Sequence, residues 1–158
     1  LSQSRRIIGI GGTDSHGLLS RYSDDFKTVC TYILAKEAFN YDAAHDIALV
    51  YEALRAGRCF VGADKVAKAS GFKCEVVCGD NAVQMGARAC LSRGACLNVH
   101  APEPGLIRII HNGDAILEEK GVDLEAALES PGVYRVEVKR RVYGRYVPWI
   151  YGNHFFLA

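Results

Sequence analysis

The residues best suited to chemistry are an aspartate and a histidine, in the stretch Gly11-Gly12-Thr13-Asp14-Ser15-His16-Gly17. This stretch follows an apolar run, Ile7 to Ile10, with the pattern of a short buried strand that ends in a loop. Residues two apart at a strand end project to the same side, so Asp14 and His16 can reach one metal ion. The pairing of a carboxylate with an imidazole suits Zn, Mn or Fe in hydrolytic sites. The alternative is that Asp14 forms an Asx-turn or caps a helix.

The other polar clusters give weaker signals. We interpret His45, His100, His111 and His154 as surface or structural histidines, because they fall on separate predicted elements. A basic aromatic stretch could contact a phosphate-bearing ligand, although we take it to be a solvated hairpin. It comprises Arg140, Arg141, Tyr143, Arg145 and Tyr146.

The six cysteines contain no Cys-x-x-Cys pair, which argues against a zinc ribbon or a thioredoxin-like site. Cys74 and Cys78 would lie about 13 Å apart along one strand, too far for a disulfide. We therefore expect free thiols and a reducing compartment, the cytoplasm.

The composition is that of a globular protein, with 49% hydrophobic and 23% charged residues in 158. A formal net charge of +1 gives no support for a nucleic-acid partner or an anionic membrane. The chain has no apolar run approaching the roughly 20 residues that span a bilayer. Because it starts at Leu1 and reaches an apolar run at once, we expect it to be part of a longer polypeptide.

The first part of the chain has a mixed α/β pattern. Residues 42–57 predict a helix, with Asp42 as the N-cap, apolar residues at helical spacing and Gly57 at the C-terminal end. The apolar side chains at that spacing are Ile47, Val50, Tyr51 and Leu54. Cys59 to Val61 predicts a strand, and Lys65 to Ser70 a connection. We place a domain boundary there, giving domains 1–69 and 70–158.

From Gly71 onward the pattern has a period of two and is interrupted by Gly, Asn, Asp and Pro, which is typical of short antiparallel strands. Asn112-Gly113 favours a hairpin turn. Tyr134 follows a Pro-Gly corner and could tie it through its hydroxyl, as in immunoglobulin-like sandwiches. The predicted fold class is therefore α+β: the remnant of an α/β domain, then an immunoglobulin-like antiparallel β-sandwich.

Three stretches resemble the polymerase and histidinol phosphatase (PHP) family of phosphoesterases. The stretch from Gly11 to Gly17 resembles its last metal-binding motif, and Tyr51 to Val61 is similar to its next helix and strand. Residues 131–138 and 148–153 resemble the ends of members with a C-terminal β-domain, with Gly152 and His154 as departures. The resemblance implies that the mixed α/β remnant comes from a PHP-type barrel.

The resemblance implies hydrolysis of a phosphate ester by a parent enzyme with divalent metal ions (Zn, Mn or Fe). Asp14 and His16 would be metal ligands, and the substrate a phosphate-ester small molecule or a nucleotide. The family's His-x-His motif is absent here, so we expect the chain alone to be inactive. The alternatives are a β-sandwich binding or scaffolding module, with Trp149 and Tyr151 as the candidate contact residues, and a domain that only stabilises the enzyme. The sequence does not indicate catalytic or substrate-binding residues, or the oligomeric state.

Overall fold

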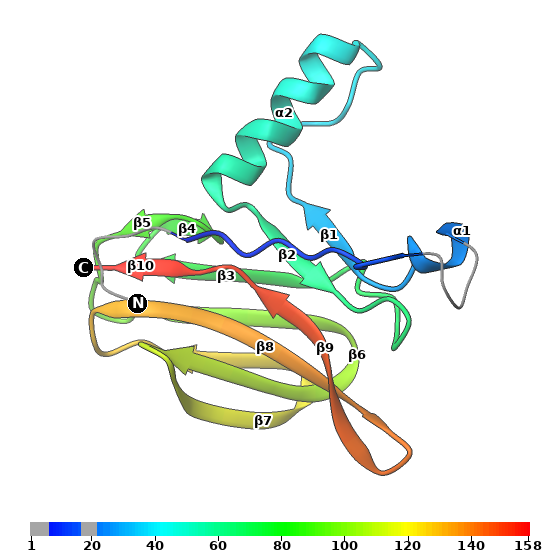
Figure 1. The fold of residues 1–158 in the computed structure, drawn as a ribbon. Helices are drawn as coiled ribbons and strands as arrows, with labels where there is room; N and C mark the ends of the chain where they lie inside the picture. The colour runs from blue at the N-terminus through cyan, green and yellow to red at the C-terminus, as the bar shows by residue number, and fades with distance from the viewer. Residues whose placement is uncertain (1–6, 17–21) are drawn as a thin grey trace.

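The computed structural model describes residues 7–16 and 22–158. It is 49% strand and 12% helix, and its strands form a single sheet that curls into a half-barrel (Figure 1). The two helices are α1 (Tyr22–Asp25) and α2 (Ala43–Ala56). The strands are β1 (Cys30–Ile33), β2 (Cys59–Gly62), β3 (Lys73–Cys78), β4 (Asn81–Gln84), β5 (Arg88–Ala89), β6 (Cys96–His111), β7 (Asp114–Ala127), β8 (Gly132–Val142), β9 (Arg145–Gly152) and β10 (Phe155–Leu157).

The predicted fold class is therefore wrong. The main path of the sheet runs β1-β2-β9-β8-β6-β3-β4, so the strands of the supposed α/β remnant continue the same sheet as the later strands. All pairings are antiparallel except the short β5–β10 pair. Neither a barrel remnant nor a two-sheet sandwich is present in the described residues. The domain boundary near residue 69 stays a prediction.

Long strands explain why one sheet forms in place of two. β6 spans 16 residues and pairs with β3 through its first part, with β8 through its last part and with β7 along most of its length. Its register with β7 shifts between His100 and Gly105, where the sequence Pro102-Glu103-Pro104 interrupts the ladder. Such an irregularity bends a strand and increases its twist. β6 is thus one long bent strand, which curls the sheet around its own core.

The predicted turns are confirmed. Asn112 and Gly113 have positive φ angles of 52° and 107° at the β6–β7 hairpin, as a type I′ turn requires. The Tyr134 hydroxyl donates a hydrogen bond to the Ser130 carbonyl at 2.6 Å, which ties the corner before β8. This corner contact therefore exists without an immunoglobulin-like sandwich.

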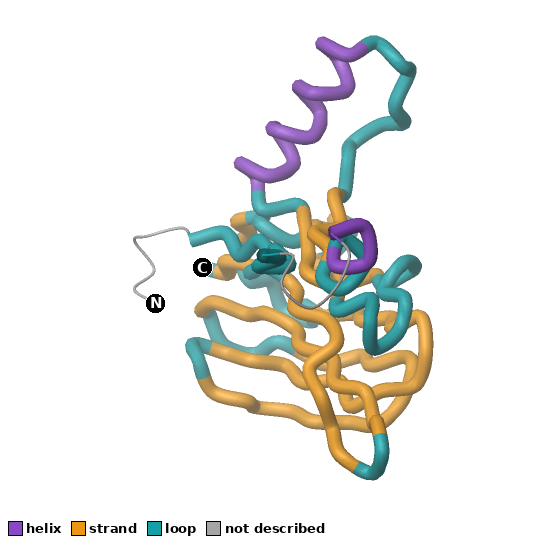
Figure 2. Tube along the Cα trace, turned by 45° about the vertical axis from the view of Figure 1, so that its right-hand side comes forward, coloured by secondary structure: helices purple, strands orange, loops and turns teal. Residues whose placement is uncertain are grey.

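Helix α2 has the predicted ends but not the predicted buried face. The Asp42 side chain accepts a hydrogen bond from the His45 backbone N–H at 2.8 Å, and Gly57 ends the helix with a φ of 69°. The buried side chains of the helix are Leu49 and Ala53, whereas Ile47 and Tyr51 are exposed. Figure 2 shows the helix projecting from the sheet. Its C-terminal end lies close against the body, where a Cβ on Gly86 would lie 1.8 Å from the Ala56 carbonyl oxygen.

The core lies inside the half-barrel. Its largest fully buried side chains include Trp149, Tyr134 and Phe60, and the Trp149 indole N–H donates to the Ala67 carbonyl at 2.7 Å. All six cysteines are free, as predicted. Among the described residues, no helix has the length and apolar character needed to cross a membrane.

Candidate metal-binding loop and sheet trough

The segment that carries Asp14 and His16 is not a strand. Residues 7–16 have no regular secondary structure, and Ile7 and Ile10 are exposed, so the predicted buried strand is wrong. The segment nevertheless lies against β2, because a Cβ on Gly11 would stand 2.4 Å from Val61 Cγ1. Only glycine permits this close approach.

Two side chains hold the segment in place. They form hydrogen bonds with its backbone, as a neighbouring strand would. The buried Asn153 amide accepts from the Gly9 N–H at 2.7 Å and donates to the Gly9 carbonyl at 3.0 Å. It also donates to the Cys59 carbonyl at 2.9 Å. The Thr31 hydroxyl accepts from the Gly11 N–H at 2.9 Å and lies 3.0 Å from the Gly11 carbonyl, to which it donates. The loop that follows therefore starts from a fixed point on the sheet.

Asp14 and His16 are exposed on that loop. Asp14 has a φ of 52°, in the left-handed region, so the two side chains are not arranged as on a strand end. Their side chains are 94% and 67% exposed, and His16 Nδ1 lies 3.9 Å from Asp14 Oδ1.

The His16 ring is oriented by its own backbone. Nδ1 lies 2.7 Å from the Asp14 carbonyl oxygen, which can only accept, so Nδ1 carries the proton. In the neutral ring, Nε2 then presents its lone pair to solvent. Metal-binding histidines commonly donate their other N–H to a carbonyl in this way. The neighbouring Ser15 hydroxyl donates to the carboxylate of Asp25, the last residue of α1, which restrains the loop.

The described residues do not complete a metal site. Within residues 7–16 and 22–158, no group of three or more His, Cys, Asp or Glu side chains lies so that it could hold an ion. Catalytic zinc sites use three protein ligands. Asp14 and His16 therefore fit as part of a ligand set and not as a full set.

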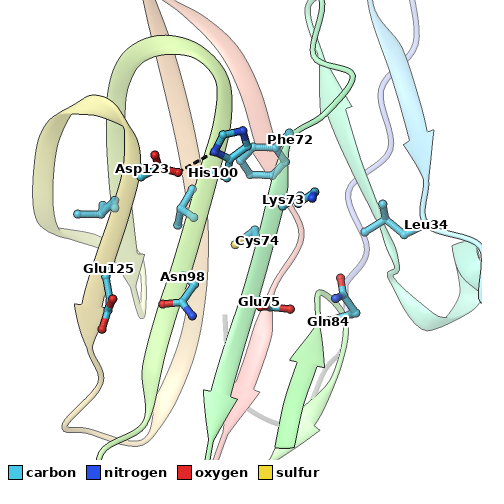
Figure 3. A pocket seen from close by; sticks show the side chains of 12 residues that line it. Leu34, Phe72, Lys73, Cys74, Glu75, Gln84, Asn98, His100, Asp123 and Glu125 are labelled. Atoms are coloured by element: carbon cyan, nitrogen blue, oxygen red, sulfur yellow. Dashed lines mark hydrogen bonds and ion pairs between the residues drawn. The ribbon is translucent and has the colours of Figure 1, made fainter.

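A second candidate lies on the outer face of β3, β6 and β7, in a trough of about 470 Å³ (Figure 3). The strand registers place Lys73, His100 and Asp123 in one row across it. The next row consists of Glu75, Asn98 and Glu125. His100 Nδ1 is 2.7 Å from Asp123 Oδ1, which leaves Nε2 free.

This trough can bind but has no evident nucleophile. A His–Asp pair activates a hydroxyl or a thiol in nucleophilic catalysis, yet none of the residues that line the trough carries a hydroxyl. Cys74, its only thiol, is buried. Burial raises the pKa of the Cys74 thiol far above its usual range, so it stays protonated. The trough thus offers cross-strand polar rows suited to a polar ligand.

The remaining candidates lie elsewhere. Trp149 is fully buried and supplies core packing, whereas Tyr151 is partly exposed on β9. His45 contacts Asp46 and Glu37, and His111 stacks on Tyr134. Burial lowers the pKa of His154, with Arg135 nearby as the second cause. None of these groups joins Asp14 and His16.

Sequence reasoning missed the groups that position the loop. Asn153 lies 144 residues from Gly9, and no local pattern links them. The His100–Asp123 pair was also missed, although both residues lie in the region after Gly71 that alternates with a period of two. Correct strand pairing would have placed them opposite each other.

The comparisons with known proteins add nothing to this geometry. No protein-family model, curated protein or solved structure matches the chain.

Proposed function

We propose that this chain is part of a metal-dependent phosphoesterase and contributes Asp14 and His16 to a divalent metal site. The observation that carries the proposal is the orientation of His16, whose Nδ1 is bound to the Asp14 carbonyl while Nε2 faces solvent. The resemblance of residues 11–17 to the PHP metal-binding motif supports the same role. The missing ligands would come from another part of the enzyme.

The attachment of the loop supports this proposal. Asn153 and Thr31 fix the segment before it, and within it Ser15 contacts Asp25. A loop held before and between its two exposed donors can present them to further ligands with little loss of conformational entropy. When bound, a Zn, Mn or Fe ion would supply hydroxide near neutral pH and stabilise charge on the phosphoryl oxygens. Asp14 would add negative charge to the site, and His16 a directional nitrogen donor.

A second candidate function is favoured by the trough on β3, β6 and β7. Its cross-strand rows combine Lys73, His100 and Asp123 with carboxylates and an amide. This surface would make the chain a binding module for a small polar ligand, without a catalytic role. Trp149 takes no part in it, because its side chain is in the core.

The test compares the chain with a longer product of the same coding sequence that includes a His-x-His segment upstream of Leu1. Each is assayed with p-nitrophenyl phosphate and added Mn²⁺ or Zn²⁺. We expect the chain alone to show almost no turnover, because two donors hold a metal weakly. We expect the longer protein to be active, and Asp14→Ala or His16→Ala to lower its rate by at least tenfold.

Asp24→Ala is the matched control, because Asp24 is another exposed carboxylate beside the same loop. It should leave the rate unchanged. Full activity in both the Asp14→Ala and His16→Ala variants would refute the ligand role. So would an upstream sequence that lacks a His-x-His motif.

A further inference from the structure

The tip of the β8–β9 hairpin has a turn residue that folding does not explain. Tyr143 and Gly144 form the turn with φ angles of 46° and 82°. Asn, Asp or Gly normally occupies such positions, because other side chains are strained there. Tyr143 is also fully exposed, at 102%, so its ring gains no burial energy in return. An unfavourable residue that packs against nothing suggests a role in binding.

The tip also extends beyond the rest of the sheet (Figure 1). β6 pairs with β8 only as far as Lys139, and beyond this point β8 has β9 as its one described neighbour. Arg141 pairs across the ribbon with Tyr146, and Val142 with Arg145. Among the described residues the edge of β8 is therefore unpaired at the tip, where the side chains of Arg141, Tyr143, Arg145 and Tyr146 are exposed.

The charge of this ribbon differs from that of the whole chain. Residues 138–152 contain four basic side chains and no acidic one, although the chain as a whole has a net charge of +1. Arg140 is already engaged, with Glu103, the Pro104 carbonyl and the Trp149 ring. Arg141 and Arg145 are exposed, and no ion pair joins them to an acidic side chain of the described residues.

We propose that the hairpin tip, residues 141–146, binds single-stranded nucleic acid. Tyr143 and Tyr146 would stack on bases, and Arg141 and Arg145 would contact phosphates. Proteins that bind single strands combine these two kinds of side chain in this way, and stacking needs an aromatic ring that is open on one face. A ligand with phosphates but no bases would need only the arginines to bind. The strained Tyr143 therefore favours a ligand that has bases as well as phosphates. The inference differs from the expectation drawn from net charge, because four basic residues cluster on one ribbon. It does not depend on the metal site.

The test measures binding of a fluorescein-labelled oligothymidylate of about 20 nucleotides by anisotropy at low salt. We expect Tyr143→Asn to weaken binding about tenfold through lost stacking. Asn suits the turn, so this variant should fold at least as well as the parent, which thermal melting checks. The Arg141→Gln/Arg145→Gln double variant should reduce the slope of log K against log salt by about 1.4, as two lost phosphate contacts predict.

Tyr41→Asn is the matched control, because Tyr41 has a φ of 68°, is 97% exposed and lies in the loop before α2. It should bind the oligonucleotide as the parent does. The proposal is overturned if Tyr41→Asn and Tyr143→Asn lose equal affinity or if neither loses any. Tighter binding to vesicles of equal parts phosphatidylcholine and phosphatidylserine than to the oligonucleotide would overturn it as well.

Discussion

The N-terminal region (residues 7–58) and the sheet body (residues 59–158) differ in how many large apolar side chains they expose and bury. Of the eleven large hydrophobic side chains exposed among the described residues, seven lie in the N-terminal region, which buries only Leu49 and Ala53. The seven are Ile7, Ile10, Phe26, Phe39, Tyr41, Ile47 and Tyr51. The main core cluster draws all of its buried members from the sheet body.

This difference shows that burial of apolar side chains stabilises the body more than it stabilises the N-terminal region. The body is held by burial of apolar area, which contributes roughly 25 cal/mol per Å². The N-terminal region is attached by the β1–β2 ladder, by the stacking of Tyr32 on Phe60 and by polar contacts of Asn153 with Gly9 and of Tyr32 with Asp64. Exposed apolar side chains gathered on one region are typical of a surface that another protein segment covers. They agree with the proposal that further parts of an enzyme complete the site.

The largest expected effect comes from the core. Trp149→Ala should lower the free energy of unfolding by about 3–5 kcal/mol, because it opens a cavity among fully buried side chains and removes the bond to Ala67. Ile47→Ala, on the exposed face of α2, should change it by less than about 0.5 kcal/mol. Urea denaturation measures both. Similar losses in the two variants would show that α2 packs as tightly as the body does.

A smaller effect is expected at the attachment of the loop. Asn153→Ala leaves the Gly9 N–H and carbonyl without their partner, which should cost about 1–3 kcal/mol locally. Hydrogen exchange should show loss of protection at Gly9 while β6 and β8 remain protected. Asn81→Ala, at an exposed position in β4, is the control. Retained protection at Gly9 would mean that another contact holds the segment.

The smallest effect concerns pH at the contact between β1 and the loop after β2. Burial raises the pKa of Asp64, but hydrogen bonds from Tyr32, the Ala69 N–H and Lys68 outweigh it, so the pKa lies below the usual 3.8. A lowered pKa in the folded state adds stability above the unfolded-state pKa, and this stability is lost as the pH falls through the folded value. Asp64→Asn should therefore cost about 1 kcal/mol at neutral pH.

The same substitution should cost progressively less below the ordinary carboxyl pKa of 3.8. Urea denaturation at neutral pH and in acid measures the difference between the variant and the parent. Asp80→Asn, at an exposed position, supplies the comparison. A cost that stays constant with pH would contradict the assignment.

The sequence predicted local structure correctly where residues close together in the chain determine it. The caps of α2 at Asp42 and Gly57 follow from side-chain capping and from a left-handed glycine, both set by neighbouring residues. The Asn112-Gly113 turn and the bond from Tyr134 to its corner are equally local. The free cysteines followed from their spacing. The predictions for the helix caps, the turn and the corner depend on contacts within a few residues.

For the candidate site, the sequence predicted only the types of residue involved. Asp14 and His16 were identified from their pattern, but the left-handed backbone at Asp14 and the bond from His16 to its carbonyl were not. The predicted strand at Ile7 to Ile10 failed because an apolar run forms a strand only when another strand pairs with it. In this structure Asn153 and Thr31 take the place of that strand.

The sequence by itself determined which stretches alternate, where most of them turn and which groups could bind a metal. The tertiary structure alone decided that β2 pairs with β9, that β6 continues through Pro102 and Pro104, and that one curled sheet replaces a sandwich. The physical reason is that alternation with a period of two specifies a buried face and not the strand that lies beside it. Pairing depends on side chains far apart in the chain, which meet only when the core closes.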